Sequence, residues 1–220
     1  MEKVVIIGAS GHGRVIGDIL KKSGDYELIG YIDSYKDPGS KILDYEVLGS
    51  EEILPKMFKE SGVSQGIIGI GDNYTRQQMA HKIKKLVPEF EFINAIHPDS
   101  VISEYVTLGS GIAIMAGVVL NPGTIIRDHC IVNTKSSVGH DCTIRAFSSI
   151  APGVTVGGHV SLGPLSSLAI GCVVRNNIDI GENTLIGAGS LVIRDFGDHI
   201  VAYGHPAKSM GNRVLGDTSV

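Results

Sequence analysis

A large aliphatic residue recurs at every sixth position between residues 96 and 192. The seventeen positions are Ile96, Ile102, Leu108, Ile114, Leu120, Ile126, Val132, Val138, Ile144, Ile150, Val156, Leu162, Leu168, Val174, Ile180, Ile186 and Val192. Neither the helical period of 3.6 nor the strand period of 2 produces this spacing. A period of six is typical of a parallel β-helix, in which each hexapeptide forms a short strand and a turn. We therefore expect these side chains to stack inside a triangular prism, three hexapeptides to a coil.

The three cysteines follow the same repeat. Cys130, Cys142 and Cys172 each lie four positions after an aliphatic residue, in a slot that small residues often fill. They show no CxxC spacing, so we interpret them as small core residues. Cys142 lies two residues after His140, which makes an acyl-cysteine role an alternative. The register points Cys142 into the prism, however, where a thiol is a poor nucleophile.

The first part of the chain has a different pattern, in which apolar strands alternate with amphipathic helices. Strands are expected over 3–7, 26–32, 66–70 and 90–93, and helices over 14–22, 50–60 and 74–86. This alternation predicts a small parallel α/β sheet of the Rossmann-like kind. The sequence thus predicts two domains, 1–93 and 94–220, the second ending in a short C-terminal cap.

A glycine-rich loop, Gly8-Ala9-Ser10-Gly11-His12-Gly13, joins the first strand to the first helix. Such a loop lets backbone N–H groups approach a phosphate at a helix N-terminus. Asp33 ends the second strand, where the acid of a Rossmann domain meets a ribose. The spacing is GxxGxG and not GxGxxG, and no hydride-transfer residues are visible, so we favour nucleotide binding over a redox dinucleotide. A simple tight turn is the alternative, and His12 either caps the helix or contacts the ligand.

Composition excludes several classes of function. The 220 residues are 43% hydrophobic and 19% charged, with a net charge of −4 and no Lys/Arg block, which argues against nucleic acid as a partner. No apolar run reaches the ~18–20 residues of a membrane span. The segment MEKVVIIGAS begins a strand at once and lacks the layout of a signal peptide. We therefore expect a cytoplasmic protein.

His140 and Asp141 form the strongest candidate for chemistry. His140 falls in the outward turn of its hexapeptide, where an imidazole reaches solvent and suits a general base. The neighbouring acid of Asp141 would fix the imidazole tautomer, as in a catalytic triad. One coil is eighteen residues, so Gly158 lies above His140, and we expect an open slot there that an acyl chain could fill. The alternative is an ordinary exposed turn histidine.

The remaining histidines give no metal site. A zinc ion held across a trimer interface needs three converging histidines, and the sequence shows no such set, so no metal is expected. His159 stacks over Asp141, one coil further along, as a neighbour of the pair or a plain surface residue.

Three segments also match a known family in order. They are Gly8 to Gly13, Val132-Asn133-Thr134 through Gly139-His140-Asp141-Cys142, and Gly204-His205-Pro206-Ala207-Lys208. With the order of an α/β domain followed by hexapeptides, the chain resembles the sugar O-/N-acyltransferase family, which includes sialic-acid O-acetyltransferases and the N-acetyltransferases of bacillosamine and perosamine biosynthesis. The resemblance covers nearly the whole chain. It implies a left-handed parallel β-helix, an exception to the usual right-handed crossover, and a homotrimer with active sites between subunits.

The resemblance also implies a chemistry. Acetyl-CoA would lie between neighbouring β-helices, and the N-terminal domain would bind a nucleotide-sugar acceptor. Carried over by position, His140 would be the base and Asp141 the acid that orients it. The implied substrate-binding residues are Ser10, Gly11, His12, Asp33, Gly71, Asn73 and Asn133, and the implied contacts of the thioester arm are Gly158, Ile170 and Ala188.

One position departs from the family. In the family, a second histidine often precedes the Ile-Ala-Pro-Gly run and approaches the acyl group. Here Ser148-Ser149 precede Ile150, so either the Ser149 hydroxyl makes the contact with the acyl group or that contact is missing. We expect N-acetylation of a nucleotide-linked amino sugar by direct transfer. O-acetylation of a sugar hydroxyl, as on a sialic acid, and a non-catalytic nucleotide-sugar-binding scaffold are the alternatives.

Overall fold

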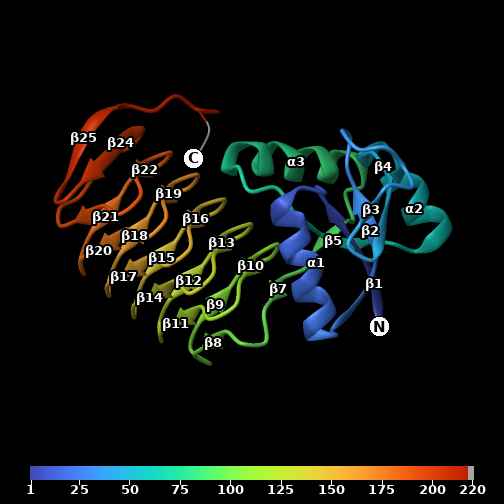
Figure 1. Cartoon of the computed structure of the whole chain (residues 1–220), viewed down its shortest axis with the longest axis horizontal. Coiled ribbons are helices and arrows are strands. Elements are labelled where there is room, and N and C mark those ends of the chain that lie inside the picture. Colours follow the sequence, from blue (N-terminus) through green and yellow to red (C-terminus); the bar gives the residue numbers. More distant parts are fainter. Residues whose placement is uncertain (218–220) are drawn as a thin grey trace. The chain divides into compact units, whose positions relative to one another are not determined.

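The computed structural model describes residues 1–217 and divides the chain into two compact units. The first unit comprises residues 1–71 and 75–98, and the second comprises residues 72–74 and the chain from Asp99 onward. Figure 1 shows an α/β arrangement for the first unit and a stack of short strands for the second. Each unit is described separately below.

The first unit is built on one largely parallel sheet, with the strand order β3-β4-β2-β1-β5-β6. Its strands are β1 (Glu2–Ile7), β2 (Tyr26–Ile32), β3 (Lys41–Ile42), β4 (Tyr45–Gly49), β5 (Gln65–Ile68) and β6 (Glu91–Phe92), and β7 (Ala95–Ile96) follows. Only β3 runs antiparallel to its neighbour, β4. The sequence predicted neither β3 nor β4, because β3 has only two residues and the pair is too short to show a clear strand period.

The helices of this unit are α1 (Gly11–Ser23), a 3₁₀ turn η1 (Glu51–Ile53) that runs into α2 (Leu54–Ser61), and α3 (Asn73–Leu86). Val5, Ile7 and Ile32 from the central strands are at most 1% exposed and pack with the fully buried Ile83 of α3. Because both faces of such a sheet are covered, its central strands contain continuous apolar runs, such as residues 4–7 of β1. The predicted helices and strands of residues 1–93 are confirmed, with boundaries that differ by a few residues.

The second unit is a parallel β-helix with three faces. The first face holds β10 (Ala113–Ile114), β13 (Ile131–Val132), β16 (Ser149–Ile150), β19 (Ser167–Leu168), β22 (Leu185–Ile186), β24 (Ile200–Gly204) and β25 (Ala207–Asn212). The second holds β8 (Val101–Ile102), β11 (Val119–Leu120), β14 (Ser137–Val138), β17 (Thr155–Val156), β20 (Val173–Val174) and β23 (Leu191–Val192). The third holds β9 (Thr107–Leu108), β12 (Ile125–Ile126), β15 (Thr143–Ile144), β18 (Ser161–Leu162) and β21 (Asp179–Ile180).

The register of these strands confirms the coil of eighteen residues. Ser137 pairs with Thr155, which in turn pairs with Val173. The aliphatic residues of the repeat from Ile114 to Val192 are at most 3% exposed. At the end of the stack, β24 and β25 form an antiparallel hairpin.

Every sixth residue from Gly111 to Gly189 lies in the left-handed backbone region. The non-glycine residues with φ between 55° and 61° include His129, Lys135, Asp141, Phe147 and His159. Glycine or asparagine fits such a conformation most easily. Asp141 and His159 therefore occupy equivalent turn positions in successive coils.

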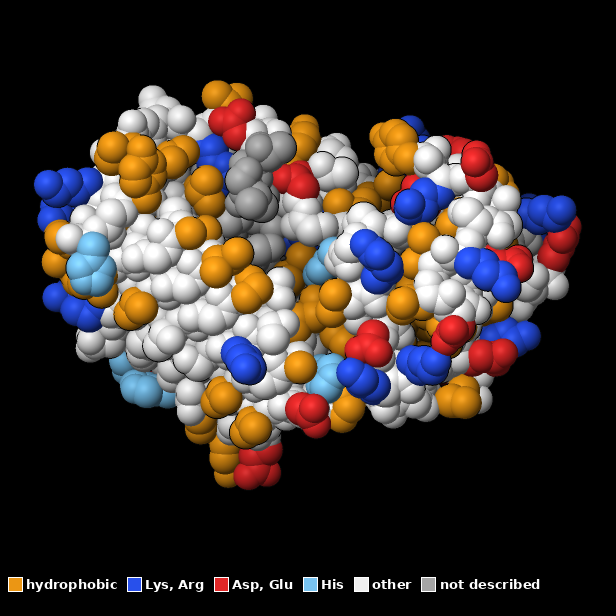
Figure 2. All heavy atoms as spheres, viewed as in Figure 1, with side chains coloured by type: hydrophobic (Ala, Val, Ile, Leu, Met, Phe, Trp, Pro, Cys, Tyr) orange, Lys and Arg blue, Asp and Glu red, His pale blue; other side chains and the backbone are white. Residues whose placement is uncertain are grey.

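Charge is distributed differently over the two units. Side chains of both signs are interspersed on the α/β unit, while the visible face of the β-helix carries mainly uncharged side chains (Figure 2). Within residues 1–217, no helix has the length and hydropathy needed to cross a membrane.

Candidate active site

His140 and Asp141 form a hydrogen-bonded pair on an outer turn of the β-helix. Nδ1 of His140 lies 2.8 Å from Oδ2 of Asp141. Both side chains are more than half exposed, at 59% and 53%. Because the carboxylate accepts a hydrogen bond, the pairing favours the tautomer with its proton on Nδ1 and leaves Nε2 free to accept a proton. This arrangement is that of an oriented general base.

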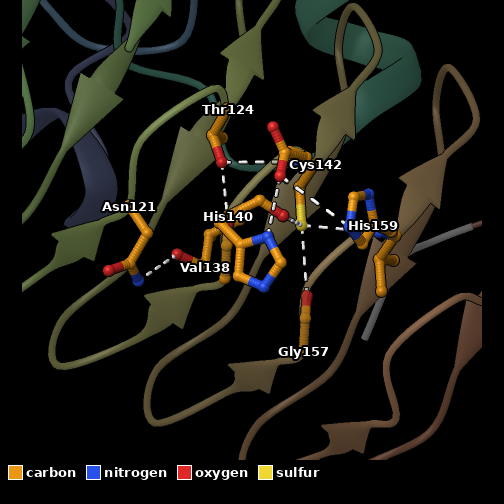
Figure 3. A network of polar contacts seen from close by, with 10 residues as sticks. Asn121, Thr124, Val138, His140, Cys142, Gly157 and His159 are labelled. Atoms are coloured by element: carbon orange, nitrogen blue, oxygen red, sulfur yellow. Dashed lines mark hydrogen bonds and ion pairs between the residues drawn. The ribbon is translucent and has the colours of Figure 1, made fainter. Parts of the chain in front are cut away.

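Hydrogen bonds from the preceding coil support the turn that carries the pair (Figure 3). The Thr124 hydroxyl donates to the Gly139 carbonyl over 2.7 Å, and the Asn121 side-chain amide donates to the Val138 carbonyl over 2.8 Å. The backbone N–H of Asp141 donates to the Pro122 carbonyl. The His140 backbone is thus fixed on both sides.

Gly158 provides the space for the His140 ring. A Cβ atom built on Gly158 would lie 2.6 Å from Nε2 of His140, closer than side-chain carbons come in proteins. The open slot expected beside the ring is therefore wrong: the imidazole itself occupies the space that a Gly158 side chain would fill. A glycine is required there because any larger side chain would displace the ring.

Cys142 contributes no nucleophile to this site. Its side chain is fully buried, and Sγ lies 3.1 Å from the Gly157 carbonyl oxygen (Figure 3). Burial raises the pKa of the Cys142 thiol, and it raises the pKa of Cys172 to about 12. Because the thiolate is the reactive form, the acyl-cysteine alternative loses its chemical basis.

A second candidate region is a cavity of about 210 Å³ in the α/β unit, at the ends of β1, β2 and β5. Its walls are mostly apolar, with Ile32, Ile70 and Met79 among them. Ser10 and Asp33 are the predicted substrate-binding residues that line it, whereas Gly11, His12, Gly71 and Asn73 do not. Ligands of parallel α/β sheets bind at this edge of the sheet.

Asp33 organises the glycine loop. Its Oδ2 accepts a hydrogen bond from the backbone N–H of Ala9 and its Oδ1 accepts one from Tyr35, each over 2.8 Å. Gly8 adopts φ 108° and donates its N–H to the Ile32 carbonyl. Asp33 thus fixes the loop backbone as well as lining the cavity.

A buried carboxylate that was not among the predicted site residues lies in the same cavity. Glu51 is 5% exposed, accepts a hydrogen bond from the Ser34 hydroxyl, and forms an ion pair of 2.5 Å with Lys82. Burial acts to raise the pKa of Glu51, but the hydrogen bonds from Lys82 and Ser34 outweigh it and the pKa is lowered. Glu51 is therefore an ionised acceptor in the cavity wall. The sequence predicts a helix over 50–60, and no local pattern indicates that Lys82 pairs with the first acid of that segment.

His12 and Gly71 have other surroundings. His12 is the second residue of α1, behind the N-cap residue Ser10. Burial, and then the charge of Arg76, lower the pKa of His12 from 6.5 to about 4, so the ring is neutral. Gly11 is exposed, and the Gly71 carbonyl accepts a hydrogen bond of 2.8 Å from Arg76.

Comparison with known proteins assigns the family. The model of the PglD N-terminal domain matches residues 3–83. A histidine-to-asparagine variant of perosamine N-acetyltransferase from Caulobacter crescentus, in complex with CoA and GDP-perosamine, superposes with a TM-score of 0.90 at 38% identity over 96% of this chain and 98% of that one. The chain belongs to the sugar acyltransferase family of hexapeptide-repeat proteins.

Other members of this family are more distant. GDP-perosamine N-acetyltransferase from Escherichia coli is 28% identical over 190 residues, 84% of this chain and 82% of that protein. UDP-N-acetylbacillosamine N-acetyltransferase from Bacillus subtilis is 29% identical over 127 residues, 53% of this chain and 52% of that one. The acetyltransferase domain of PglB from Neisseria gonorrhoeae, in complex with acetyl coenzyme A, superposes with a TM-score of 0.86 at 28% identity over 95% of this chain and 99% of that one.

In this acyltransferase, the remaining predicted residues lie at a different corner of the prism from His140. The His140 turn joins β14 of the second face to β15 of the third. Ile170 and Ala188 lie in turns that join the first face to the second, and they stack one coil apart, since the Gly189 N–H donates to the Ile170 carbonyl. Asn133 lies at that corner too, where its side-chain oxygen accepts a 2.8 Å hydrogen bond from the Thr134 N–H.

Ser149 and Asn73 of the acyltransferase bond to each other within the second unit. The Ser149 hydroxyl donates to Oδ1 of Asn73 over 2.6 Å. Asn73 is 1% exposed, and its amide nitrogen donates to Ser167 Oγ over 2.9 Å and to the carbonyls of Leu165 and Ser166. Through these hydrogen bonds, the Asn73 amide holds residues 72–74 to the β-helix. A ligand would have to break them to reach Asn73 or the Ser149 hydroxyl.

Proposed function

We propose that this acyltransferase transfers the acetyl group of acetyl-CoA to the amine of a nucleotide-linked amino sugar. The observation that carries the proposal is the 2.8 Å contact between His140 Nδ1 and Asp141 Oδ2 on an exposed turn. The names of the N-acetyltransferase relatives and their complexes with CoA and GDP-perosamine support this choice of co-substrate and acceptor. Histidine variants of the Caulobacter enzyme were crystallised with both ligands, which supports a role for a histidine.

The proposed reaction is direct transfer in a ternary complex. The acceptor nitrogen attacks the thioester carbonyl while Nε2 of His140 takes a proton from that nitrogen. The C–S bond then breaks, and the CoA sulfur leaves and receives the proton. Asp141 keeps the other ring proton on Nδ1 and stabilises the imidazolium, and a backbone N–H of a neighbouring subunit steadies the oxyanion.

The nucleotide part of the acceptor is assigned to the cavity between Ser10 and Asp33 in residues 1–93. Its apolar walls suit the faces of a base, and the ionised Glu51 suits its polar edge. Ser10, which lines the cavity, is the N-cap of α1, and a helix N-terminus suits a phosphate. The acyltransferase domain is assigned to residues 94–220, and its substrate-binding and cofactor-binding residues stay predictions, as does the cytoplasmic location.

A second copy of the chain is part of the proposal. His140 and the predicted cofactor residues Ile170 and Ala188 stand at different corners of one prism, so one site that uses both needs a neighbouring prism. Ile170 is 60% exposed, and Val101 and Val173 on the outer face of the second sheet are 64% and 43% exposed. Large apolar side chains left exposed are typical of a contact surface. A homotrimer with its sites between subunits fits this arrangement.

The deciding experiment is a thiol-release assay with acetyl-CoA and a panel of UDP-, GDP- and CMP-linked sugars, each in amino and hydroxy forms. We expect release with a nucleotide amino sugar, and loss of about 10²–10⁴-fold in kcat for His140→Ala with CoA binding retained. Release only with hydroxy sugars would replace the amine by a hydroxyl acceptor. Binding of both ligands without turnover in the wild type would leave a non-catalytic scaffold.

A further inference from the structure

We propose that His140, Asp141 and His159 bind a divalent transition-metal cation of the Zn²⁺ type, and that the bound cation stops acetyl transfer. In the described part of the chain, these residues are the one group of three or more His, Cys, Asp and Glu side chains whose ligand atoms converge, all within 4.8 Å of one another. The binding site stands on geometry alone. The inhibitory effect rests on the proposed function, because it requires His140 to be the base.

The distances suit a tetrahedral ion. Oδ2 of Asp141 lies 2.8 Å from Nδ1 of His140 and 3.8 Å from Nε2 of His159. Two ligand atoms bound to Zn²⁺ at about 2.05 Å in tetrahedral geometry stand roughly 3.3 Å apart. One observed separation is slightly shorter than this value and the other slightly longer. The ligand atoms of the two imidazoles lie within 4.8 Å of each other, so side-chain rotation must shorten that separation as well for all three residues to hold one ion.

The fold holds these residues in place before any ion binds. Asp141 and His159 occupy equivalent left-handed turn positions, with φ 55° and 56°, in successive coils. The backbone N–H of His159 donates to the His140 carbonyl over 2.9 Å, which fixes the spacing of the two turns. The imidazole rings of His140 and His159 meet edge to face, 4.9 Å between centroids (Figure 3).

Glycines on either side make this arrangement sterically possible. Gly158 leaves room for the His140 ring, and a Cβ atom on Gly123 would collide with Oδ1 of Asp141. The Gly123 N–H donates to the Tyr105 carbonyl of the preceding coil, so the hydrogen bonds that join successive turns continue at this position. Both side chains thus converge toward His159 because neither neighbouring coil carries a side chain in their way.

The donor set selects the class of ion. Two imidazoles and one carboxylate suit Zn²⁺ and related transition metals, whereas Mg²⁺ and Ca²⁺ prefer oxygen ligands alone. The His159 side chain is 56% exposed, and the other two are exposed to a similar degree, so an ion reaches the site from solvent. Water can fill the fourth coordination position, as in zinc sites with three protein ligands.

Coordination would disable the proposed base by a change of tautomer. In the free pair, Nδ1 donates its proton to Asp141 and Nε2 holds the lone pair that accepts the substrate proton. When Nδ1 gives its lone pair to a cation, the neutral ring carries its proton on Nε2. The proton moves from Nδ1 to Nε2 through solvent, and no group is oxidised or reduced. Nε2 then has no lone pair for the acceptor amine.

The first test measures zinc binding directly, with tag-free full-length protein, no CoA present, and a chromophoric chelator as competitor. We expect one tightly bound Zn²⁺ per chain. His159→Asn removes a ligand, so it should weaken zinc binding by more than the ~10-fold that changes outside the ligand set cause. Asparagine suits the left-handed turn, so the fold is kept. His199→Asn is the matched control, because His199 also lies in a turn with φ 58° but outside the cluster, and we expect unchanged binding.

The second test measures acetylated sugar by chromatography at initial rates, so that released CoA does not bind the zinc. Zn²⁺ should inhibit the wild type and EDTA should reverse this, while His159→Asn should keep its basal rate within about twofold and resist zinc. Equal zinc affinity in the wild type and His159→Asn would refute the metal site. Binding that depends on His159 but leaves the rate unchanged would refute the inhibition. A wild type that binds zinc through His159 but acetylates no sugar on the panel would uphold the site and refute the proposed function.

Discussion

The imidazole of His140 lies so close to the α-carbon of Gly158 that a single added carbon would stand 2.6 Å from Nε2. The two residues are one coil apart, and the His159 N–H to His140 carbonyl bond locks their turns together. The orientation of the proposed base therefore depends on Gly158, which acts only by leaving space for the ring.

Gly158→Ala should lower kcat about 10²-fold, because the new methyl group displaces the ring from its productive position. The nearest atoms are all at the end of the His140 side chain, so the chain accommodates the change without unfolding. We expect the Tm to stay within about 3 °C of the wild type. Gly211→Ala is the control, since a Cβ atom there meets nothing within 4 Å. An active Gly158→Ala enzyme would show that the ring position seen here does not matter for turnover.

Asp141→Asn should impair turnover more than Asp141→Ala. The asparagine amide can donate to Nδ1 of His140, which places the ring proton on Nε2, whereas alanine leaves the ring free to adopt either tautomer. In a serine protease triad the corresponding change costs about 10⁴ in kcat. Steady-state kinetics of both variants, with CoA affinity as a control for the fold, would check the order. The opposite order would mean that Asp141 acts through its charge alone.

Asn73→Ala should lower the free energy of unfolding by about 2 kcal/mol and leave the KM for the nucleotide sugar unchanged. The reason is that the Asn73 amide joins residues 72–74 to Ser149 and Ser167 in the β-helix. Denaturant unfolding and steady-state kinetics measure the two effects separately. A raised KM with normal stability would instead support the predicted role of Asn73 in substrate binding.

His12 should make stability depend on pH below neutrality. Burial and Arg76 lower its pKa from 6.5 to about 4 in the folded chain, so between these values the unfolded chain binds a proton that the folded chain does not. The contribution is fully present above pH 6.5 and is lost as the pH falls toward 4, by up to about 3 kcal/mol. Thermal unfolding from pH 8 to pH 4 should show a shallower decline for His12→Gln than for the wild type. Parallel curves would mean that His12 titrates alike in both states.

The repeat pattern predicted the β-helix, its coil length, the inward set of aliphatic residues and the outward position of His140. It also placed Asp141 under His159. All of these follow from one periodicity, because each coil repeats the same backbone path and a residue's place depends only on its position in the hexapeptide. The α/β alternation and the glycine loop were read from equally local signals.

Three features came only from the tertiary structure. The His140 ring fills the space that a Gly158 side chain would take, Asn73 bonds to Ser149, and Glu51 pairs with Lys82 and Ser34 in the cavity wall. Each depends on a side-chain rotamer or on a contact between segments distant in the sequence. Rotamers and long-range contacts produce no periodic pattern in the sequence. The sequence by itself determined where the backbone of this protein runs, because apolar burial repeats along it. The packing of particular side chains decided which polar groups face a ligand and which hold the fold together, because hydrogen bonds form only where the folded chain brings their partners together.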